Sequence, residues 1–251
     1  RYELLSLVGA GAYGSVYRAR DSELDEIVAV KVLRSEHIVQ PDALERFRSE
    51  VRLARRVAHP NVARTYDIGA HKDERFLTME YIDGQPLTRL SPIGAAVADL
   101  LPLRLVIDIG VQLCAGLGAL HAAGIVHRDM KTDNVLVGHE GRVVITDFGI
   151  ARALKAADAE LGADSTAMAA LIGTPAYMAP EQVRGNTLVD TRADLYALGV
   201  MLFQLLTGQL PFTGGSAMES ALARLYEAPK DPLALRPELP GSLVAFLRRS
   251  L

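Results

Sequence analysis

The chain has 251 residues, of which 49% are hydrophobic and 23% are charged, and its formal net charge is −3. This length suits one large domain or two small lobes with a cleft, and the composition is ordinary for a folded protein. The slightly acidic balance gives no reason to expect a nucleic-acid partner, and the single cysteine, Cys114, excludes an internal disulfide.

The first 33 residues are expected to form β-strands around a glycine-rich turn at residues 9–14. The pattern G-x-G-x-x-G would open a helix in a dinucleotide-binding fold, but β-type residues follow it here. A strand–loop–strand context fits a flap whose backbone N–H groups approach phosphate oxygens. A glycine-rich hairpin without any ligand explains the same residues.

The next elements alternate between helix and strand. Apolar spacing predicts a helix over residues 41–57, strands over 63–68 and 75–82, a loosely patterned helical segment over 84–101, and a long helix over 103–123. The apolar runs 105–126 and 193–210 contain Asp108 and Asp194, so we expect core helices rather than membrane spans. Cys114 falls within the long helix over 103–123, so we expect it to be a core residue rather than a reactive one.

A dense polar cluster lies between the apolar segment that ends at Val126 and the β-like run that begins at Val135. Its Asp129, Lys131 and Asn134 can bind a hydroxyl, a phosphate and a metal ion, which is the composition of a phosphoryl-transfer site. Polar groups placed between two buried elements need such a reason, because burying them unpaired is costly.

The ordered set of motifs resembles the protein kinases, and it covers the whole chain. The set comprises the glycine loop, Lys31, Glu50, residues 127–134, Asp147-Phe148-Gly149, Ala179-Pro180-Glu181 and Asp194. Lys131 and Thr174 resemble the serine/threonine branch, and residues 173–182 resemble the bacterial Hanks-type kinases. The resemblance implies an α+β fold in two lobes, a small antiparallel sheet with one helix (about 1–82) and a mainly helical lobe (about 83–251).

The resemblance also implies roles for individual residues. Asp129 would accept the proton of the attacking hydroxyl, Lys131 would steady the transferring phosphate, and Asn134 and Asp147 would hold Mg²⁺. Lys31, paired with Glu50, would position the α- and β-phosphates of ATP, and Met79 would be the gatekeeper beside the adenine. The implied nucleotide-binding residues are Val8, Gly9, Ala10, Gly11, Ala12, Tyr13, Gly14, Ser15, Val16, Ala29, Lys31, Glu50, Met79, Glu80 and Ile82.

The implied activity is transfer of the γ-phosphoryl group of ATP to serine or threonine of proteins, with autophosphorylation at Ser165 or Thr166 in bacterial signalling. We expect a cytoplasmic domain without a membrane span, with any anchor of the parent protein outside it, and a homodimer for autophosphorylation is an open possibility. The start at Arg1 suggests an excerpt, and the arginine that pairs with Glu181 in the family would lie beyond Leu251. Thr132 and Asp133 replace residues common in the family, and neither is expected to provide a required group.

Two alternatives have different functions. A pseudokinase acting as a nucleotide-free docking module would normally have lost Lys31, Asp129 or Asp147, and all three are present. A small-molecule kinase of related fold would not need residues 173–181, which build a peptide platform in the resembling family.

Overall fold

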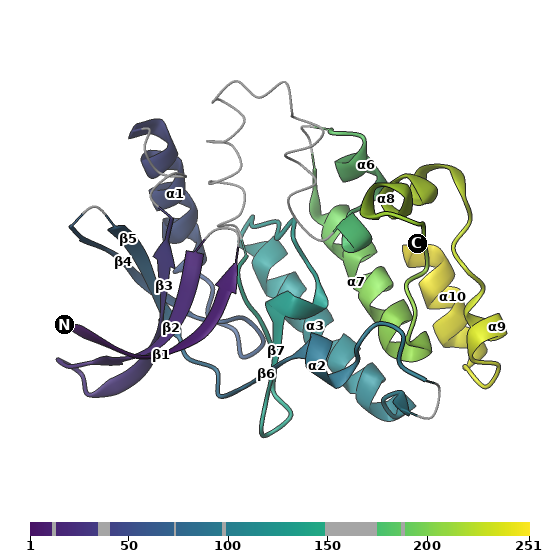
Figure 1. The fold of residues 1–251 in the computed structure, drawn as a ribbon, viewed down its shortest axis with the longest axis horizontal. Helices are drawn as coiled ribbons and strands as arrows, with labels where there is room; N and C mark the ends of the chain where they lie inside the picture. The colour runs from purple at the N-terminus through teal and green to yellow at the C-terminus, as the bar shows by residue number, and fades with distance from the viewer. Residues whose placement is uncertain (12–13, 35–40, 73, 97–98, 149–174, 187–188) are drawn as a thin grey trace.

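The computed structural model describes residues 1–11, 14–34, 41–72, 74–96, 99–148, 175–186 and 189–251 (Figure 1). A strand-rich part is followed along the chain by a mainly helical part, so the predicted α+β arrangement is confirmed. The predicted boundary between two lobes near residue 82 stays a prediction.

Five antiparallel strands form the first sheet, in the order β1-β2-β3-β5-β4. The strands are β1 (Tyr2–Gly11), β2 (Gly14–Asp21), β3 (Glu26–Leu33), β4 (Thr65–His71) and β5 (Glu74–Glu80). The glycine-rich turn therefore joins two strands and opens no helix, as its β-type flanks predicted. The register places Val16 of β2 opposite Lys31 of β3, and Lys31 opposite Leu77 of β5.

Helix α1 (Pro41–Ala54) packs on this sheet. Phe47 and Val51, four residues apart and therefore on one face of the helix, are 1% and 3% exposed and share a core with Ala29, Leu77 and Met79. The same spacing that predicted the helix thus explains which face of it is buried.

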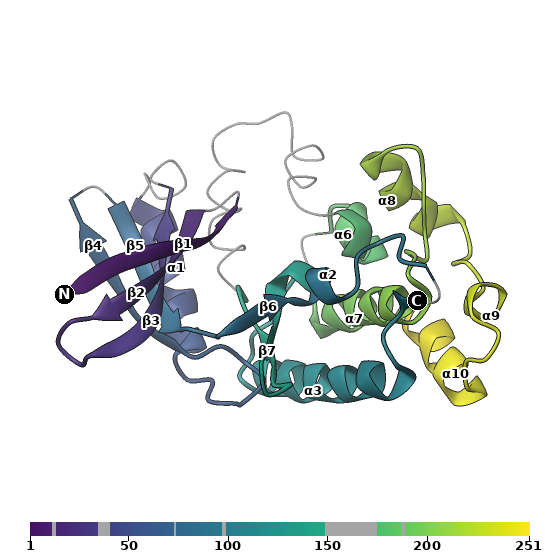
Figure 2. The same cartoon turned by 60° about the horizontal axis from the view of Figure 1, so that its bottom comes forward.

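The helical part is built around α3 (Leu103–Ala122) and α7 (Thr191–Thr207), which pack against each other and lie side by side in Figure 2. Around them lie α2 (Leu87–Leu90), α6 (Pro180–Val183), α8 (Ala217–Tyr226), α9 (Pro232–Leu235) and α10 (Gly241–Ser250). By length and composition alone, α3 could cross a membrane. Its Ile109, Leu113 and Leu117 are at most 1% exposed, which supports the prediction of a core helix.

Two predictions for this part were wrong. In the segment 84–101, a short strand β6 (Gly84–Pro86) and four helical residues of α2 are followed by turns over residues 91–96, because Pro92 cannot donate a helical hydrogen bond and Gly94 has a φ of 86°. Cys114 is exposed rather than buried, since it lies on the part of α3 that the core does not cover.

A second sheet, β6-β7-β8, contains β7 (Val135–Gly138) and β8 (Val143–Ile145). The buried side chain of Asn61 fixes β8 to the rest of the fold. Its amide donates to the carbonyl of Val143 at 2.7 Å and to Oε1 of Gln112 on α3 at 2.8 Å, and the same Oε1 accepts from the N–H of Val143 at 2.9 Å. Asn61 therefore positions the strand that leads into Asp147.

We predict that Asn61→Ala destabilises the domain, because the carbonyl of Val143 and the amide of Gln112 lose a buried donor. The expected cost is about 2–3 kcal/mol in the free energy of unfolding, measured by urea denaturation. Asn186→Ala, at an exposed position, is the matched control and should change stability by less than about 0.5 kcal/mol. Equal midpoints for the two variants would show that the Asn61 bridge adds nothing to stability.

Candidate phosphoryl-transfer site

The carboxylate of Asp194 holds the loop that carries the predicted catalytic residues. Asp194 lies in the first turn of α7 and is 1% exposed. Its oxygens accept from the backbone N–H groups of His127 and Arg128, each at 2.8 Å, and from Nε2 of His121, also at 2.8 Å. Arg128 has a φ of 66°, in the left-handed region that is unfavourable for side chains other than glycine. The three hydrogen bonds help to hold this conformation.

His127 fixes the loop from the other side. It is 1% exposed, its Nε2 donates to the carbonyl of Thr146 at 2.9 Å, and its Nδ1 accepts from the N–H of Asp129 at 3.3 Å. The two partners define one neutral tautomer, because a carbonyl can only accept and a backbone N–H can only donate. His127 therefore joins Asp129 to the end of β8.

The predicted catalytic residues Asp129, Lys131 and Asn134 lie in contact in the structure. Nζ of Lys131 lies 3.0 Å from Oδ2 of Asp129, and Nδ2 of Asn134 donates to the carbonyl of Asp129 at 2.7 Å. Nδ2 of Asn134 also donates to Oδ2 of Asp129 at 3.2 Å, so a cation and an amide orient this carboxylate, while its side chain stays 18% exposed. This arrangement can receive a hydroxyl proton close to a cation that stabilises phosphate charge.

Lys31 from the first sheet pairs with Asp147, which is 116 residues away in sequence. Nζ of Lys31 lies 2.7 Å from Oδ1 of Asp147, whose φ is 60°. Burial by itself would raise the pKa of the Asp147 carboxyl, but the charge and the hydrogen bond of Lys31 outweigh it and lower this pKa below its ordinary value. Asp147 is therefore ionised at neutral pH.

The predicted pair of Lys31 and Glu50 is not formed within the described part of the chain, where Lys31 contacts Asp147 instead. Glu50 lies on α1 and is half-buried. The roles of Lys31 and Glu50 toward ATP stay predictions.

Most of the predicted nucleotide-binding residues that the structure describes lie on β1, β2, β3 and the end of β5, while Glu50 lies on α1 and Ile82 follows β5. The β1–β2 register pairs Gly9 with Val16 and Ala10 with Ser15, next to Lys31, and Val8 is exposed. Gly14 has a φ of 150°, and a Cβ there would lie 2.0 Å from the carbonyl oxygen of Val32, so the turn requires glycine. Ala12 and Tyr13 lie outside the described residues.

The residues predicted to lie around the adenine are found where β3 and β5 pair. Ala29 lies opposite Met79, and both are 7% exposed in one core. The N–H of Glu80 donates to the carbonyl of Arg64 at 2.8 Å, and its carboxylate pairs with Arg142 at 2.6 Å. The backbone N–H of Glu80 is thus already used, and the backbone group that Glu80 would offer to the predicted adenine is its carbonyl oxygen. Ile82 follows two residues later.

The donor set fits the metal predicted for Asn134 and Asp147. The N–H of Thr146 donates to the carbonyl of Asn134 at 2.8 Å, which brings Asp147 beside Asn134. Because Nδ2 of Asn134 faces Asp129, its Oδ1 lies on the opposite side of the amide. One carboxylate and one amide oxygen suit Mg²⁺, which takes its other ligands from water and substrate phosphates.

Sequence reasoning missed how residues 175–182 are fastened beside this loop. Gln182 donates to the carbonyl of Arg128 at 2.9 Å, and Tyr177 shares a hydrogen bond of 3.0 Å with Thr132. Arg224 of α8, which is 6% exposed, donates to the carbonyls of Ala176 and Met178. No local pattern pointed to Arg224, because its partners are backbone atoms about 46 residues earlier.

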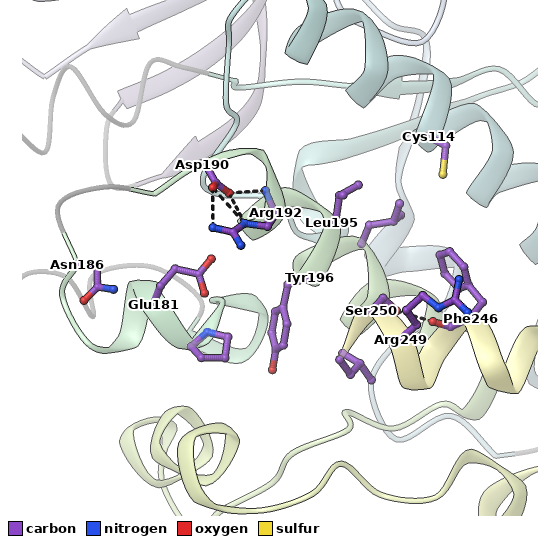
Figure 3. Close-up of a pocket in the computed structure, with 13 residues that line it drawn as sticks. Cys114, Glu181, Asn186, Asp190, Arg192, Leu195, Tyr196, Phe246, Arg249 and Ser250 are labelled. Carbon is purple, nitrogen blue, oxygen red and sulfur yellow. Dashed lines mark hydrogen bonds and ion pairs between the residues drawn. The ribbon is translucent and has the colours of Figure 1, made fainter.

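The partner predicted for Glu181 was not found among the described residues. Glu181 lines a pocket of about 660 Å³ between α6, α7 and α10, where Tyr196 and Leu251 also lie (Figure 3). Arg192, which also lines this pocket, pairs with Asp190 at 2.9 Å. The pairing of Glu181 with an arginine beyond Leu251 stays a prediction.

Comparison with known proteins identifies the family. The model of the protein kinase domain matches residues 2–243. The chain is 38% identical over 255 residues to the serine/threonine-protein kinase PknB of Mycobacterium tuberculosis, and 36% identical over 243 residues to PrkC of Bacillus subtilis. These alignments cover 100% and 97% of this chain but 39% and 36% of the relatives, so the chain spans little more than a third of their length.

A solved structure agrees with the sequence comparison. The PknI kinase domain of Mycobacterium tuberculosis superposes with a TM-score of 0.73 at 28% identity, and the match covers 100% of this chain and 86% of that domain. The family resemblance and the fold class predicted from the sequence are confirmed. The two relatives named above are bacterial serine/threonine kinases, and the chain belongs to the protein kinase domain family.

Proposed function

We propose that this domain transfers the γ-phosphoryl group of ATP to serine or threonine hydroxyls of proteins. The observation that carries the proposal is the convergence of two groups from distant parts of the chain. Lys31 of the first sheet contacts Asp147, and Asp129, Lys131 and Asn134 contact one another in the loop next to it. Phosphoryl transfer depends mainly on such positioning and on stabilisation of charge.

Each residue has a defined part in this proposal. Asp129 orients the acceptor hydroxyl and takes its proton, while Lys131, 3.0 Å away, stabilises negative charge on the transferring group. Lys31 holds the α- and β-phosphates under residues 8–16, and Ala29, Met79, Glu80 and Ile82 enclose the adenine. Asn134 and Asp147 would hold Mg²⁺, which would neutralise negative charge on the phosphates.

The alternative of a nucleotide-free pseudokinase is not favoured, because Lys31, Asp129 and Asp147 are all present and in contact with partners of opposite charge. A protein rather than a small molecule as acceptor is supported by the fastening of residues 175–182 beside Asp129. We also propose that the substrate is a protein and that the domain lies in the cytoplasm, where ATP is supplied.

The first test concerns Asp129. Asp129→Asn should lower the phosphorylation rate of a generic protein such as casein by about 10²–10⁴-fold, because the amide cannot accept the proton. Affinity for MgATP should be retained, since Asp129 faces the acceptor. Asp133→Asn, at an exposed position of the same loop, is the matched control and should keep the wild-type rate. Near wild-type phosphorylation by Asp129→Asn would refute the assigned mechanism.

The second test uses the depressed pKa of Asp147. A carboxyl whose folded-state pKa lies below its ordinary value of 3.8 stabilises the fold above that value, and this contribution is lost as the pH falls through the folded-state pKa. Lys31→Met leaves the partly buried carboxylate uncompensated, so the variant should be less stable than wild type at pH 7. The difference in the free energy of unfolding should narrow as the pH falls. In the variant, burial without Lys31 raises the pKa of Asp147, so its carboxyl becomes neutral first, and the wild type follows only below 3.8.

The measurement is urea unfolding of wild type and variant between pH 3.5 and 8, with the exposed Lys72→Met as the control. A difference in the free energy of unfolding between wild type and Lys31→Met that stays constant over this pH range would mean that Lys31 does not lower the pKa of Asp147.

The third test concerns the acceptor. Phosphoamino-acid analysis should show phosphothreonine and phosphoserine, because Lys131 and Thr174 match the serine/threonine pattern.

Mass spectrometry of the active protein should also locate autophosphorylation between residues 151 and 172, where Ser165 and Thr166 lie outside the described residues. Phosphotyrosine as the main product would contradict the assignment, and an unmodified segment would contradict the autophosphorylation.

A further inference from the structure

Thr132 has a role that its sequence context did not predict. It lies in the short helical turn η3 (Thr132–Asn134), between Lys131 and the metal ligand predicted at Asn134, and it is 0% exposed. Its hydroxyl lies 3.0 Å from the hydroxyl of Tyr177 and accepts from Thr88 of α2 at 3.3 Å. Thr132 therefore offers a polar group that points toward Tyr177 and away from solvent.

The hydrogen bonds around Tyr177 have a definite direction. The amide of Gln204 donates to the carbonyl of Ser91 at 3.0 Å, so its Oε1 faces Tyr177 and accepts from the hydroxyl of Tyr177 at 2.5 Å. Burial raises the pKa of Tyr177 to about 12, so this hydroxyl carries one proton at neutral pH. That proton goes to Gln204, and the proton between Thr132 and Tyr177 must come from Thr132.

This donor joins two parts of the proposed site. Thr132 is three residues after Asp129, and Tyr177 lies in η4 (Pro175–Tyr177), whose carbonyl at Ala176 is held by Arg224. The cavity between the two segments is lined by both Asp129 and Tyr177. Its volume is only about 10 Å³, which is about enough for one water molecule. The buried hydroxyl of Thr132 thus crosses the boundary between the catalytic loop and residues 175–182.

We propose that the hydroxyl of Thr132 is a positioning group for the protein acceptor, which it aligns with Asp129 by donating to Tyr177. This inference rests on the proposed kinase function and deepens it. Thr132 touches neither ATP nor the reacting atoms in the proposal, so its effect should appear in the use of the acceptor. The orientation of residues 175–182 relative to Asp129 would then depend on one buried hydrogen bond.

The test compares Thr132→Val, which replaces the hydroxyl by a methyl group of similar shape, with Thr132→Ser, which keeps it. Thr132→Val should lower kcat/KM for casein by about 3–10-fold, the worth of one hydrogen bond, while KM for MgATP changes by less than about twofold. Thr132→Ser should restore the wild-type value. Tyr177→Phe removes this bond and also the one to Gln204, so it should lower kcat/KM at least as much as Thr132→Val. The double variant should be no worse than Tyr177→Phe, because the bond between the two residues is already lost.

A matched control separates this effect from loss of stability. Thr207 is 3% exposed on α7, and its hydroxyl donates to the carbonyl of Phe203 at 2.8 Å, far from residues 175–182 in sequence. Thr207→Val should lower the melting temperature as much as Thr132→Val does, but leave kcat/KM for casein unchanged. Hydrogen exchange of residues 175–183 should accelerate in Thr132→Val and stay slow in Thr132→Ser and Thr207→Val.

Unchanged use of casein by Thr132→Val, or an equal rise in KM for casein and for MgATP, would overturn the inference. A wild-type protein that did not phosphorylate casein would overturn the proposed kinase function. Accelerated exchange in Thr132→Val would in that case still confirm the hydrogen bond between Thr132 and Tyr177.

Discussion

The rest of the site depends on the hydrogen bonds that the carboxylate of Asp194 accepts. It is 1% exposed, and it accepts three hydrogen bonds, two of them from consecutive backbone N–H groups of the loop that carries Asp129. A buried charge is stable only when it is well solvated by donors, and those donors would in turn be costly if they lost it. These hydrogen bonds therefore hold the loop against helix α7, and the other contacts of the site depend on this junction between the loop and α7.

From this junction the site extends in two directions. His127 links the loop to Thr146 at the end of β8, and Asp147 then reaches Lys31 of the five-stranded sheet. Thr132 and Gln182 link the loop to residues 175–182, which Arg224 holds from α8. One direction leads to the proposed nucleotide side and the other to the proposed acceptor side. Asp129 lies where they meet, which is the place required for a group that acts between ATP and an acceptor.

The sequence predicted much of this and missed the rest for a physical reason. Periodicity located α1 and α3, and the residue types around Asp129, Asn134 and Asp147 indicated phosphoryl transfer, because those signals are local. The helix expected over 84–101 failed, since alanine favours a helix but Pro92 and Gly94 end it. Contacts such as Arg224 with the carbonyls of residues 176 and 178 could not be predicted, because a backbone acceptor leaves no trace in residue type. The partner of Lys31 was also decided by the packing, which brings it to Asp147.

The backbone of Arg128 shows that the site cannot be moved as a short motif. Its φ of 66°, like the 60° of Asp147, costs about 1–3 kcal/mol in a chain that is free to choose another conformation. In the folded domain this cost is met by Asp194, which lies 66 residues further along the chain. A peptide of residues 124–137 would have every side chain of the loop and would still relax to an ordinary extended or helical backbone. The geometry around Asp129 is thus a property of the whole helical core, and grafting the loop onto another scaffold would also require a buried acceptor in the place of Asp194.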